Sequence, residues 1–209
     1  MIIGLINQKG GVGKTTLSLN VAHALSKKTD SSNVLVVDVD PQQSSLAWSE
    51  VRESPPPFHV IGFAKKSIHR DLPSIAERYD YVVVDSPPRV AELARACIMV
   101  SDIIIVPCTP SPYDVWASSE TLHLMEEASI YKKSLKGAFV MNRVIANTTI
   151  GREVVDALNE MALPVLNSKI SQRVIFAESA SRGLTVFDVE PEGKAVKEII
   201  NLVDEIVKL

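Results

Sequence analysis

Short runs of apolar residues alternate with stretches of helical apolar spacing along almost the whole chain. The runs are apolar throughout instead of alternating with polar residues, which is typical of strands buried on both faces of a sheet. Because helical patterns separate these runs, we predict an α/β fold in which a doubly wound, mostly parallel sheet is flanked by helices, as one domain over residues 1–209. The predicted strands cover residues 2–6, 33–37, 58–63, 81–84, 103–106 and 136–141, with a shorter candidate at 164–166.

The turn between the first predicted strand and the first predicted helix has the composition of a phosphate-binding loop. Residues 9–16 are K-G-G-V-G-K-T-T. Glycines allow a tight turn in which backbone N–H groups point at phosphate oxygens, and the following helix directs the positive end of its dipole there. We expect Lys14 to bind the terminal phosphates and Thr15 to ligate the Mg²⁺ of a nucleoside triphosphate. The residues expected to contact the nucleotide in this loop are Gly10, Gly11, Val12, Gly13, Lys14, Thr15 and Thr16.

Polar side chains follow several predicted strands where each strand ends. Asp38 and Asp40 follow the second strand, and Asp85 follows the fourth. The carboxyl ends of parallel strands meet at one edge of the sheet, where such folds bind ligands, so we expect all three carboxylates near the phosphate loop. Taken singly, each could instead cap a helix or occupy a turn. Asn142 and Arg143 end the sixth predicted strand at the same edge, and an amide can both donate to and accept from a nucleobase.

The composition is that of an ordinary globular protein. Of the 209 residues, 46% are hydrophobic and 22% are charged, which is enough for one sizeable core. The net charge of −3 gives no general attraction to nucleic acid, so DNA binding would require a local basic patch. Cys97 and Cys108 lie in or beside apolar runs without metal-ligand spacing, which indicates buried thiols in a reducing cytoplasm. We expect no secretory leader and no membrane span.

The loop departs from the general pattern G-x-x-x-x-G-K-[ST] in one respect. Gln8 stands where that pattern has glycine, and a second lysine, Lys9, precedes the glycines. This form resembles the deviant Walker A motif of the ParA/MinD family of ATPases. Residues 38–42, D-V-D-P-Q, resemble the family's switch I segment, and residues 85–88 resemble its Walker B segment. The whole chain is similar to the small, ParF-like members among the ParA partition ATPases.

The resemblance implies roles for individual residues. ATP or ADP would bind with Mg²⁺, and two subunits would close face to face on two ATP molecules, each Lys9 reaching the partner's nucleotide. Asp85 would hold Mg²⁺ through a bound water, and Asp38 would assist around the metal. Asp40 would orient or activate the attacking water, because phosphoryl transfer depends mostly on positioning and charge neutralisation. In family members an Asn at the position of Asn142 binds the adenine edge, and the next residue, here Arg143, can stack on the base or cap it.

The resemblance also implies partners and a cellular task. The ATP-bound homodimer would bind nonspecific double-stranded DNA, so the cytoplasmic protein would associate with the nucleoid. A ParB-like or adaptor protein would stimulate hydrolysis, and repeated cycles would move a plasmid, a chromosome or a protein assembly. Because the first strand begins at residue 2, we do not expect the N-terminal helix-turn-helix of longer ParA proteins.

Basic residues in the second half of the chain are candidates for DNA contacts. Between residues 131 and 152 there are basic residues and no acidic ones, and phosphate contacts of this kind give sequence-independent, salt-sensitive affinity. A solvated basic surface without a ligand is the alternative interpretation. Besides Arg143, the candidates are Lys132, Lys133, Lys136, Arg152, Lys169, Arg173 and Arg182.

Three other functions use the same scaffold. A MinD-like, membrane-associated positioning ATPase would need a basic amphipathic tail, but the helix predicted over residues 195–207 carries acid as often as base and no aromatic residue. We therefore expect this helix to pack on the sheet, and we expect no membrane contact. A dethiobiotin-synthetase-like ligase would need a substrate motif that we do not find. An iron–sulfur carrier would need paired cysteines, which Cys97 and Cys108 do not form.

Overall fold

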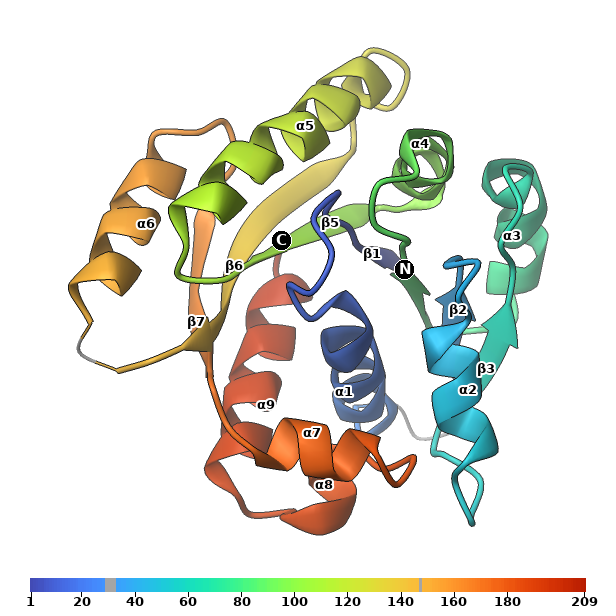
Figure 1. Ribbon diagram of the computed structural model, residues 1–209. Helices are drawn as coiled ribbons and strands as arrows, with labels where there is room; N and C mark the ends of the chain where they lie inside the picture. The colour runs from blue at the N-terminus through green and yellow to red at the C-terminus, as the bar shows by residue number, and fades with distance from the viewer. Residues whose placement is uncertain (29–32, 147) are drawn as a thin grey trace.

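The computed structural model describes residues 1–28, 33–146 and 148–209, and it confirms the predicted α/β class. The described part contains one seven-stranded sheet in the order β3-β2-β4-β1-β5-β6-β7, and every neighbouring pair of strands is parallel. Strand β1 (Ile2–Leu5) lies at the centre, between β4 (Tyr81–Asp85) and β5 (Ile103–Cys108). Helices cover both faces of the sheet (Figure 1).

The remaining strands extend the sheet on either side of this centre. They are β2 (Val34–Asp38), β3 (His59–Gly62), β6 (Lys136–Val144) and β7 (Val165–Ser171). The helices are α1 (Lys14–Ser26), α2 (Ser44–Glu50), α3 (Ile68–Ala76), α4 (Ala91–Val100), α5 (Pro112–Ser129), α6 (Thr149–Asn159), α7 (Ile175–Ala180), α8 (Val186–Val189) and α9 (Lys194–Ile206).

Each strand contributes alternate side chains to two separate cores. On β2, for example, Val34 and Val36 face the core that contains α1, α8 and α9, whereas Leu35 and Val37 face the core that contains α3, α4, α5 and α6. Since successive strand residues point to opposite faces, both sets must be apolar when both faces are covered. This requirement explains why the sequence pattern showed unbroken apolar runs.

Several strand boundaries differ from the sequence-based ones, and those of β6 and β7 bear on the site. Strand β7 covers Val165–Ser171 and is longer than the short candidate at 164–166, and β6 continues to Val144. The later residues of β7 include exposed polar side chains, because β7 is an edge strand and only part of it is covered. Asn142 and Arg143 therefore lie inside the last part of β6, which Val144 ends.

Helix α9 packs on the sheet, as predicted. Its buried side chains are Ala195, Val196, Ile199, Leu202, Val203 and Ile206. Ile200 is 38% exposed, whereas Leu202 is fully buried. The apolar stripe of this helix packs against α1 and β7.

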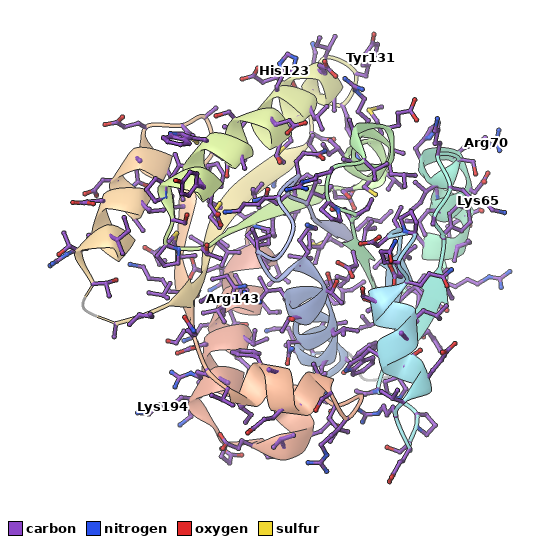
Figure 2. The ribbon with its side chains drawn as sticks, viewed as in Figure 1. Lys65, Arg70, His123, Tyr131, Arg143 and Lys194 are labelled. Carbon is purple, nitrogen blue, oxygen red and sulfur yellow. The ribbon has the colours of Figure 1, made fainter. Side chains whose placement is uncertain are left out.

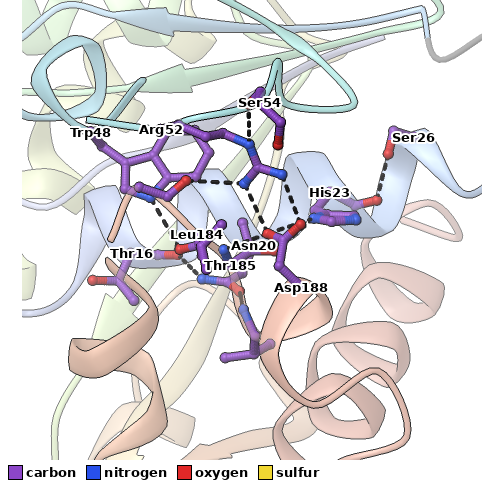
Figure 3. A network of polar contacts seen from close by, with 12 residues as sticks. Thr16, Asn20, His23, Ser26, Trp48, Arg52, Ser54, Leu184, Thr185 and Asp188 are labelled. Atoms are coloured by element: carbon purple, nitrogen blue, oxygen red, sulfur yellow. Dashed lines mark hydrogen bonds and ion pairs between the residues drawn. The ribbon is translucent and has the colours of Figure 1, made fainter. Parts of the chain in front are cut away.

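A polar network connects helices α1, α2 and α8 on one face of the sheet (Figure 3). Arg52, just after α2, donates to the Asp188 carboxylate at 2.8 and 3.0 Å and to the Gly183 carbonyl at 3.0 Å. The Trp48 indole N–H donates to the Leu184 carbonyl at 3.1 Å. The end of α2 is thereby fixed to the segment that precedes and includes α8.

The network continues from α8 to helix α1. The Thr185 hydroxyl lies 2.6 Å from Nδ1 of His23 and donates to Asp188 at 3.0 Å. Since that hydroxyl has only one proton, Nδ1 of His23 must carry a proton and act as the donor. The Asn20 side chain accepts from the Val186 N–H at 3.1 Å and donates to the Thr16 carbonyl at 2.7 Å.

Burial keeps the His23 imidazole neutral. Its pKa falls to about 4, mainly because burial disfavours the charged form, although the Asp188 charge acts in the opposite direction. The unfolded chain binds a proton at this position below about pH 6.5, whereas the native state does so only near pH 4. The neutral His23 therefore makes its full contribution to the unfolding free energy at pH values above the unfolded-state pKa of about 6.5. This contribution is lost as the pH falls toward 4.

We expect His23→Gln to remove part of the acid sensitivity of folding. The wild-type unfolding free energy should fall between pH 6.5 and 4 by about 3 kcal/mol more than that of the variant, because glutamine cannot be protonated. Urea unfolding at several pH values measures this difference, and the groups common to both proteins cancel. His69→Gln, at an exposed histidine, is the control and should follow the wild type. Parallel pH profiles for the wild type and His23→Gln would contradict the assignment.

Candidate functional site

The phosphate-binding loop lies at the carboxyl end of the central strand β1 and leads directly into α1. Gly11 and Gly13 have φ values of 80° and 94°, a region that L side chains rarely adopt. Gln8 is not among the described residues with positive φ, so the first position of the loop does not require glycine. This geometry explains why Gln8 can replace the glycine of the general pattern.

Lys14, the first residue of α1, is buried at the bottom of the loop. Its ammonium group donates to the Lys9 carbonyl at 2.9 Å. Burial lowers the pKa of Lys14, while the negative charges of Asp85 and Asp40 raise it. Lys14 therefore lies close enough to Asp85 and Asp40 for both charges to affect its pKa. This agrees with the prediction that these carboxylates lie near the phosphate loop.

Asp85, at the end of β4, is buried among hydroxyl groups. Ser45 donates to one carboxylate oxygen at 2.8 Å, and Ser18 donates to the other at 3.3 Å. Burial raises the pKa of Asp85 to about 6, hydrogen bonds from Thr15 and Ser45 lower it, and the charge of Asp38 raises it further. A nearby cation would favour the ionised form of this carboxyl group.

Asp38, at the end of β2, is fully buried and holds the start of α2. One carboxylate oxygen accepts the N–H groups of Ser45 at 2.8 Å and Leu46 at 3.1 Å, and the other accepts the Asp40 N–H at 3.0 Å. Burial raises the pKa of Asp38, and these backbone donors lower it. The carboxylate thus satisfies amide groups at a helix N-terminus that would otherwise lack partners.

Asp40 lies next to these groups in a more open position. It is half-buried, and its carboxylate accepts the Gln42 N–H at 2.9 Å. The backbone then turns through Gln43, which has a positive φ of 54°. Asp38, Asp40, Asp85 and Lys14 are thus brought together at one edge of the sheet.

The residues at this edge suit a magnesium ion that arrives with a nucleotide. Among the described residues, no group of three or more His, Cys, Asp or Glu side chains could hold a metal by itself. Mg²⁺ in nucleotide sites takes one or two protein ligands and completes its shell with phosphates and water. The Thr15 hydroxyl, which lies close enough to the Asp85 carboxylate to lower its pKa, provides such an incomplete set.

Asn142 supports the loop directly. Its amide nitrogen donates to the Val12 carbonyl at 2.7 Å, and its amide oxygen accepts the Arg143 N–H at 3.0 Å. Arg143 is exposed and has a positive φ of 55°, a conformation that costs a non-glycine residue energy. The contact to Val12 is a role for Asn142 that the sequence did not reveal.

A cavity of about 780 Å³ adjoins the loop beside Asn142. Gly13, Thr16 and Arg143 line its inner side, and the residues after β7, including Gln172 and Phe176, line the outer side. An open space of this kind, next to the phosphate loop and partly apolar, fits the base and sugar of a nucleotide.

Lys9, the second lysine of the loop, is bound within its own chain. Its ammonium group forms an ion pair with Asp114 near the start of α5, and its N–H donates to the Asn7 side chain at 2.9 Å. The predicted contact between Lys9 and a partner's nucleotide remains a prediction.

The structure divides the basic residues proposed for DNA binding. Lys132, Lys133 and Lys136 lie at or before the amino end of β6, where Lys132 donates to the Ser101 carbonyl at 2.6 Å. Arg143 lies toward the other end of that strand, and Figure 2 shows it far from Tyr131, the neighbour of Lys132. These residues therefore do not form one patch with Arg143.

The remaining basic candidates lie nearer the carboxyl edge of the sheet. Arg152 and Lys169 line one hollow of about 160 Å³ between α6 and β7. Arg173 is paired with Glu198 of α9 at 2.6 Å, so its charge is partly neutralised. Arg182 is exposed after α7.

The fold and the loop define a P-loop nucleotide-binding protein, and comparison with known proteins agrees. Residues 3–186 match the family described as CobQ/CobB/MinD/ParA nucleotide binding domain. A Halothiobacillus neapolitanus protein named Maintenance of carboxysome distribution protein A is 29% identical over 210 residues, which cover 98% of this chain and 95% of that protein. A Gloeobacter kilaueensis protein of the same name is 31% identical over 205 residues, which cover 94% and 88%.

A solved structure shows the same fold at low sequence identity. Cobyrinic acid a,c-diamide synthase from Mycobacterium smegmatis, with a bound ATP analogue and magnesium, superposes with a TM-score of 0.80 at 19% identity and covers 100% of this chain and 94% of its own. The chain belongs to the CobQ/CobB/MinD/ParA family, which confirms the resemblance of its loop to the ParA/MinD ATPases. No helix in the described part of the chain is long and apolar enough to cross a membrane.

We expect Gly13→Ala to destabilise the loop even without nucleotide. An added Cβ would lie 2.3 Å from the Asn142 amide nitrogen at a φ of 94°, so the Asn142–Val12 hydrogen bond would be lost. The unfolding free energy should fall by about 2 kcal/mol or more. Gly10→Ala is the matched control, because its Cβ would meet nothing closer than 3.8 Å. Equal unfolding free energies for the two variants in urea titrations would refute this explanation.

Proposed function

We propose that the protein is a ParA-type partition or positioning ATPase that couples ATP hydrolysis to reversible binding of nonspecific DNA. The observation that carries this proposal is the deviant loop itself. Lys9 and Lys14 are held on one loop, beside Asp40 and Asp85. Family membership over residues 3–186 supports the same conclusion.

ATP and Mg²⁺ are the cofactors. The family is a nucleotide-binding one, and a structural neighbour binds an ATP analogue with magnesium. In this chain the loop from Gly10 to Thr16 would bind the phosphates, and Asn142 and Arg143 would border the base. Mg²⁺ would be held by Thr15 and, through water, by Asp85.

Hydrolysis would depend on charge neutralisation and on the position of one water molecule. Lys14 neutralises phosphate charge from within the loop, and Lys9 would do so from the other subunit of a nucleotide-dependent homodimer. Asp40 is the carboxylate with the most open position, which supports its role in orienting the attacking water. Asp38 supports that position by fixing the backbone of Asp40.

DNA binding would come from a local basic surface that the dimer doubles. Arg152 and Lys169 share one hollow near the carboxyl edge, and Arg182 is exposed, which favours this region over Lys132, Lys133 and Lys136 at the opposite edge. A ParB-like or adaptor protein would stimulate hydrolysis and release the DNA.

The names of the relatives favour a protein assembly as the cargo. Two proteins at 29% and 31% identity over nearly the whole chain are named for the maintenance of carboxysome distribution. A metabolic enzyme is the second candidate, because cobyrinic acid a,c-diamide synthase shares the fold. ATP-dependent turnover of a small acid, with no effect of DNA, would favour that candidate.

The two lysines should have separable effects. Lys14→Ala should abolish ATP binding, because the buried cation that faces the phosphates is lost. Lys9→Ala should bind ATP within about threefold of the wild-type affinity but lose dimerisation and nearly all hydrolysis, since Lys14 and the glycine loop remain while the contact to the partner is removed together with the Asp114 ion pair. Equilibrium binding of a fluorescent ATP analogue and steady-state hydrolysis measure the two properties. Hydrolysis by Lys9→Ala at the wild-type rate would show that Lys9 does not act across a dimer.

DNA binding should require ATP. Random-sequence duplex DNA should bind with Mg-ATP but not with ADP or without nucleotide, and the affinity should fall steeply in a salt series. Asp40→Ala, which should retain the ATP dimer, should hold the DNA longer. Arg152→Ala should reduce the slope of log affinity against log salt concentration by about the amount expected for one phosphate contact per subunit. Lys133→Ala at the opposite edge is the control. Absence of binding in every nucleotide state would refute the DNA-based mechanism.

A further inference from the structure

Helix α5 begins beside the phosphate loop and carries one buried carboxylate toward it. The Asp114 side chain is 0% exposed. One of its oxygens accepts the Thr109 N–H at 2.7 Å and the Thr109 hydroxyl at 2.8 Å, and the other accepts the Lys9 ammonium group. A buried carboxylate requires partners of this kind.

Thr109 orients Asp114 independently of Lys9. Its two donors occupy one carboxylate oxygen, so the other oxygen is directed at the loop. Thr109 directly follows β5, whose backbone is fixed by hydrogen bonds to both β1 and β6. Asp114 therefore presents its acceptor from the rigid part of the fold.

Lys9 remains able to make a further contact while it is bound to Asp114. An ammonium group has three N–H donors, and the Asp114 oxygen needs only one. The Lys9 side chain is 32% exposed and lines a hollow of about 290 Å³ together with Gly10, Gly11 and Thr109. Its unused donors therefore have access to a ligand at the mouth of the loop.

We propose that Asp114 is the residue that positions Lys9 for its contact with the phosphates bound to the other subunit. The proposal rests on the ATPase and dimer function proposed above. Releasing Lys9 would leave a buried carboxylate with only the Thr109 donors, and an uncompensated buried charge is strongly unfavourable. The pair therefore stays intact when two subunits meet, and Asp114 holds Lys9 at a fixed place so that little side-chain entropy is lost on closure.

The test is a double-mutant cycle between Asp114→Asn and Lys9→Ala. Asp114→Asn keeps the shape but removes the charge, so we expect ATP hydrolysis and dimerisation on a non-hydrolysable ATP analogue to fall at least about tenfold, with ATP affinity of the monomer nearly unchanged. In the Lys9→Ala background the same substitution should leave the small residual hydrolysis rate unchanged, because Asp114 acts only through Lys9.

Two further variants separate positioning from a general structural role. Ser118→Ala is the matched control one turn along α5, where the hydroxyl donates to the Asp114 backbone carbonyl at 2.7 Å, and it should hydrolyse ATP as the wild type does. Thr109→Val removes one donor that orients Asp114, so it should lower hydrolysis in the presence of Lys9 and not in its absence. This variant provides the test if Asp114→Asn does not fold.

The outcomes distinguish this inference from the proposed function. If the wild type neither hydrolyses ATP nor dimerises on the analogue in sedimentation experiments, the proposed function is wrong. If the wild type does both and Asp114→Asn equals it, only the positioning role is wrong. A rate above the wild-type rate would also overturn the proposal, since Asp114 would then restrain Lys9. An equal loss with and without Lys9 would assign Asp114 a structural role alone.

Discussion

The parallel pairing of the central strand β1 with β4 on one side and β5 on the other determines the site. This pairing places the ends of three strands within reach of one loop, so that Asp85, at the end of β4, and Asp114, just beyond β5, approach it from opposite sides. Strand β2, on the far side of β4, adds Asp38. The loop thus lies among buried carboxylates that the strand ends and helix α5, and not the loop, hold in place. Two lysines, Lys9 and Lys14, balance that negative charge.

Much of this arrangement could be predicted from the sequence, because it depends on patterns that are local in the chain. The apolar runs marked the strands, and the order of strand, glycine-rich turn and helix marked the loop. Asp38, Asp40 and Asp85 were found because carboxyl ends of parallel strands share an edge. The grouping of Lys132 and Lys136 with Arg143 rested on their closeness in the sequence and did not predict one surface patch. These residues lie toward opposite ends of strand β6.

Other features depend on tertiary contacts that no local pattern records. Ser45 and Ser18 bond to Asp85 from two different helices, and a serine in a helix carries no signal for that role. Asp114 follows Pro110 and Pro112 in the sequence, and nothing in that local pattern indicates an ion pair with Lys9. A role for Asn142 at the adenine edge was implied by the family resemblance and suits the chemistry of its amide, whereas its contact with Val12 depends on the tertiary position of β6. Such roles follow from packing, which the sequence specifies only through the complete fold.

Helix α2 is short and fixed at both ends, so it connects two parts of the molecule rigidly. Its first residues are bound to Asp38 and Asp85, and Trp48 near its end and Arg52 just beyond it are bound to the segment from Gly183 to Asp188. That segment follows α7, part of the wall of the large cavity. Seven helical residues span only about 10 Å, too short to bend appreciably. The carboxylate edge beside the loop and the wall of the large cavity are therefore joined mechanically, and a ligand that contacts only one of these two places would engage only one end of this connection.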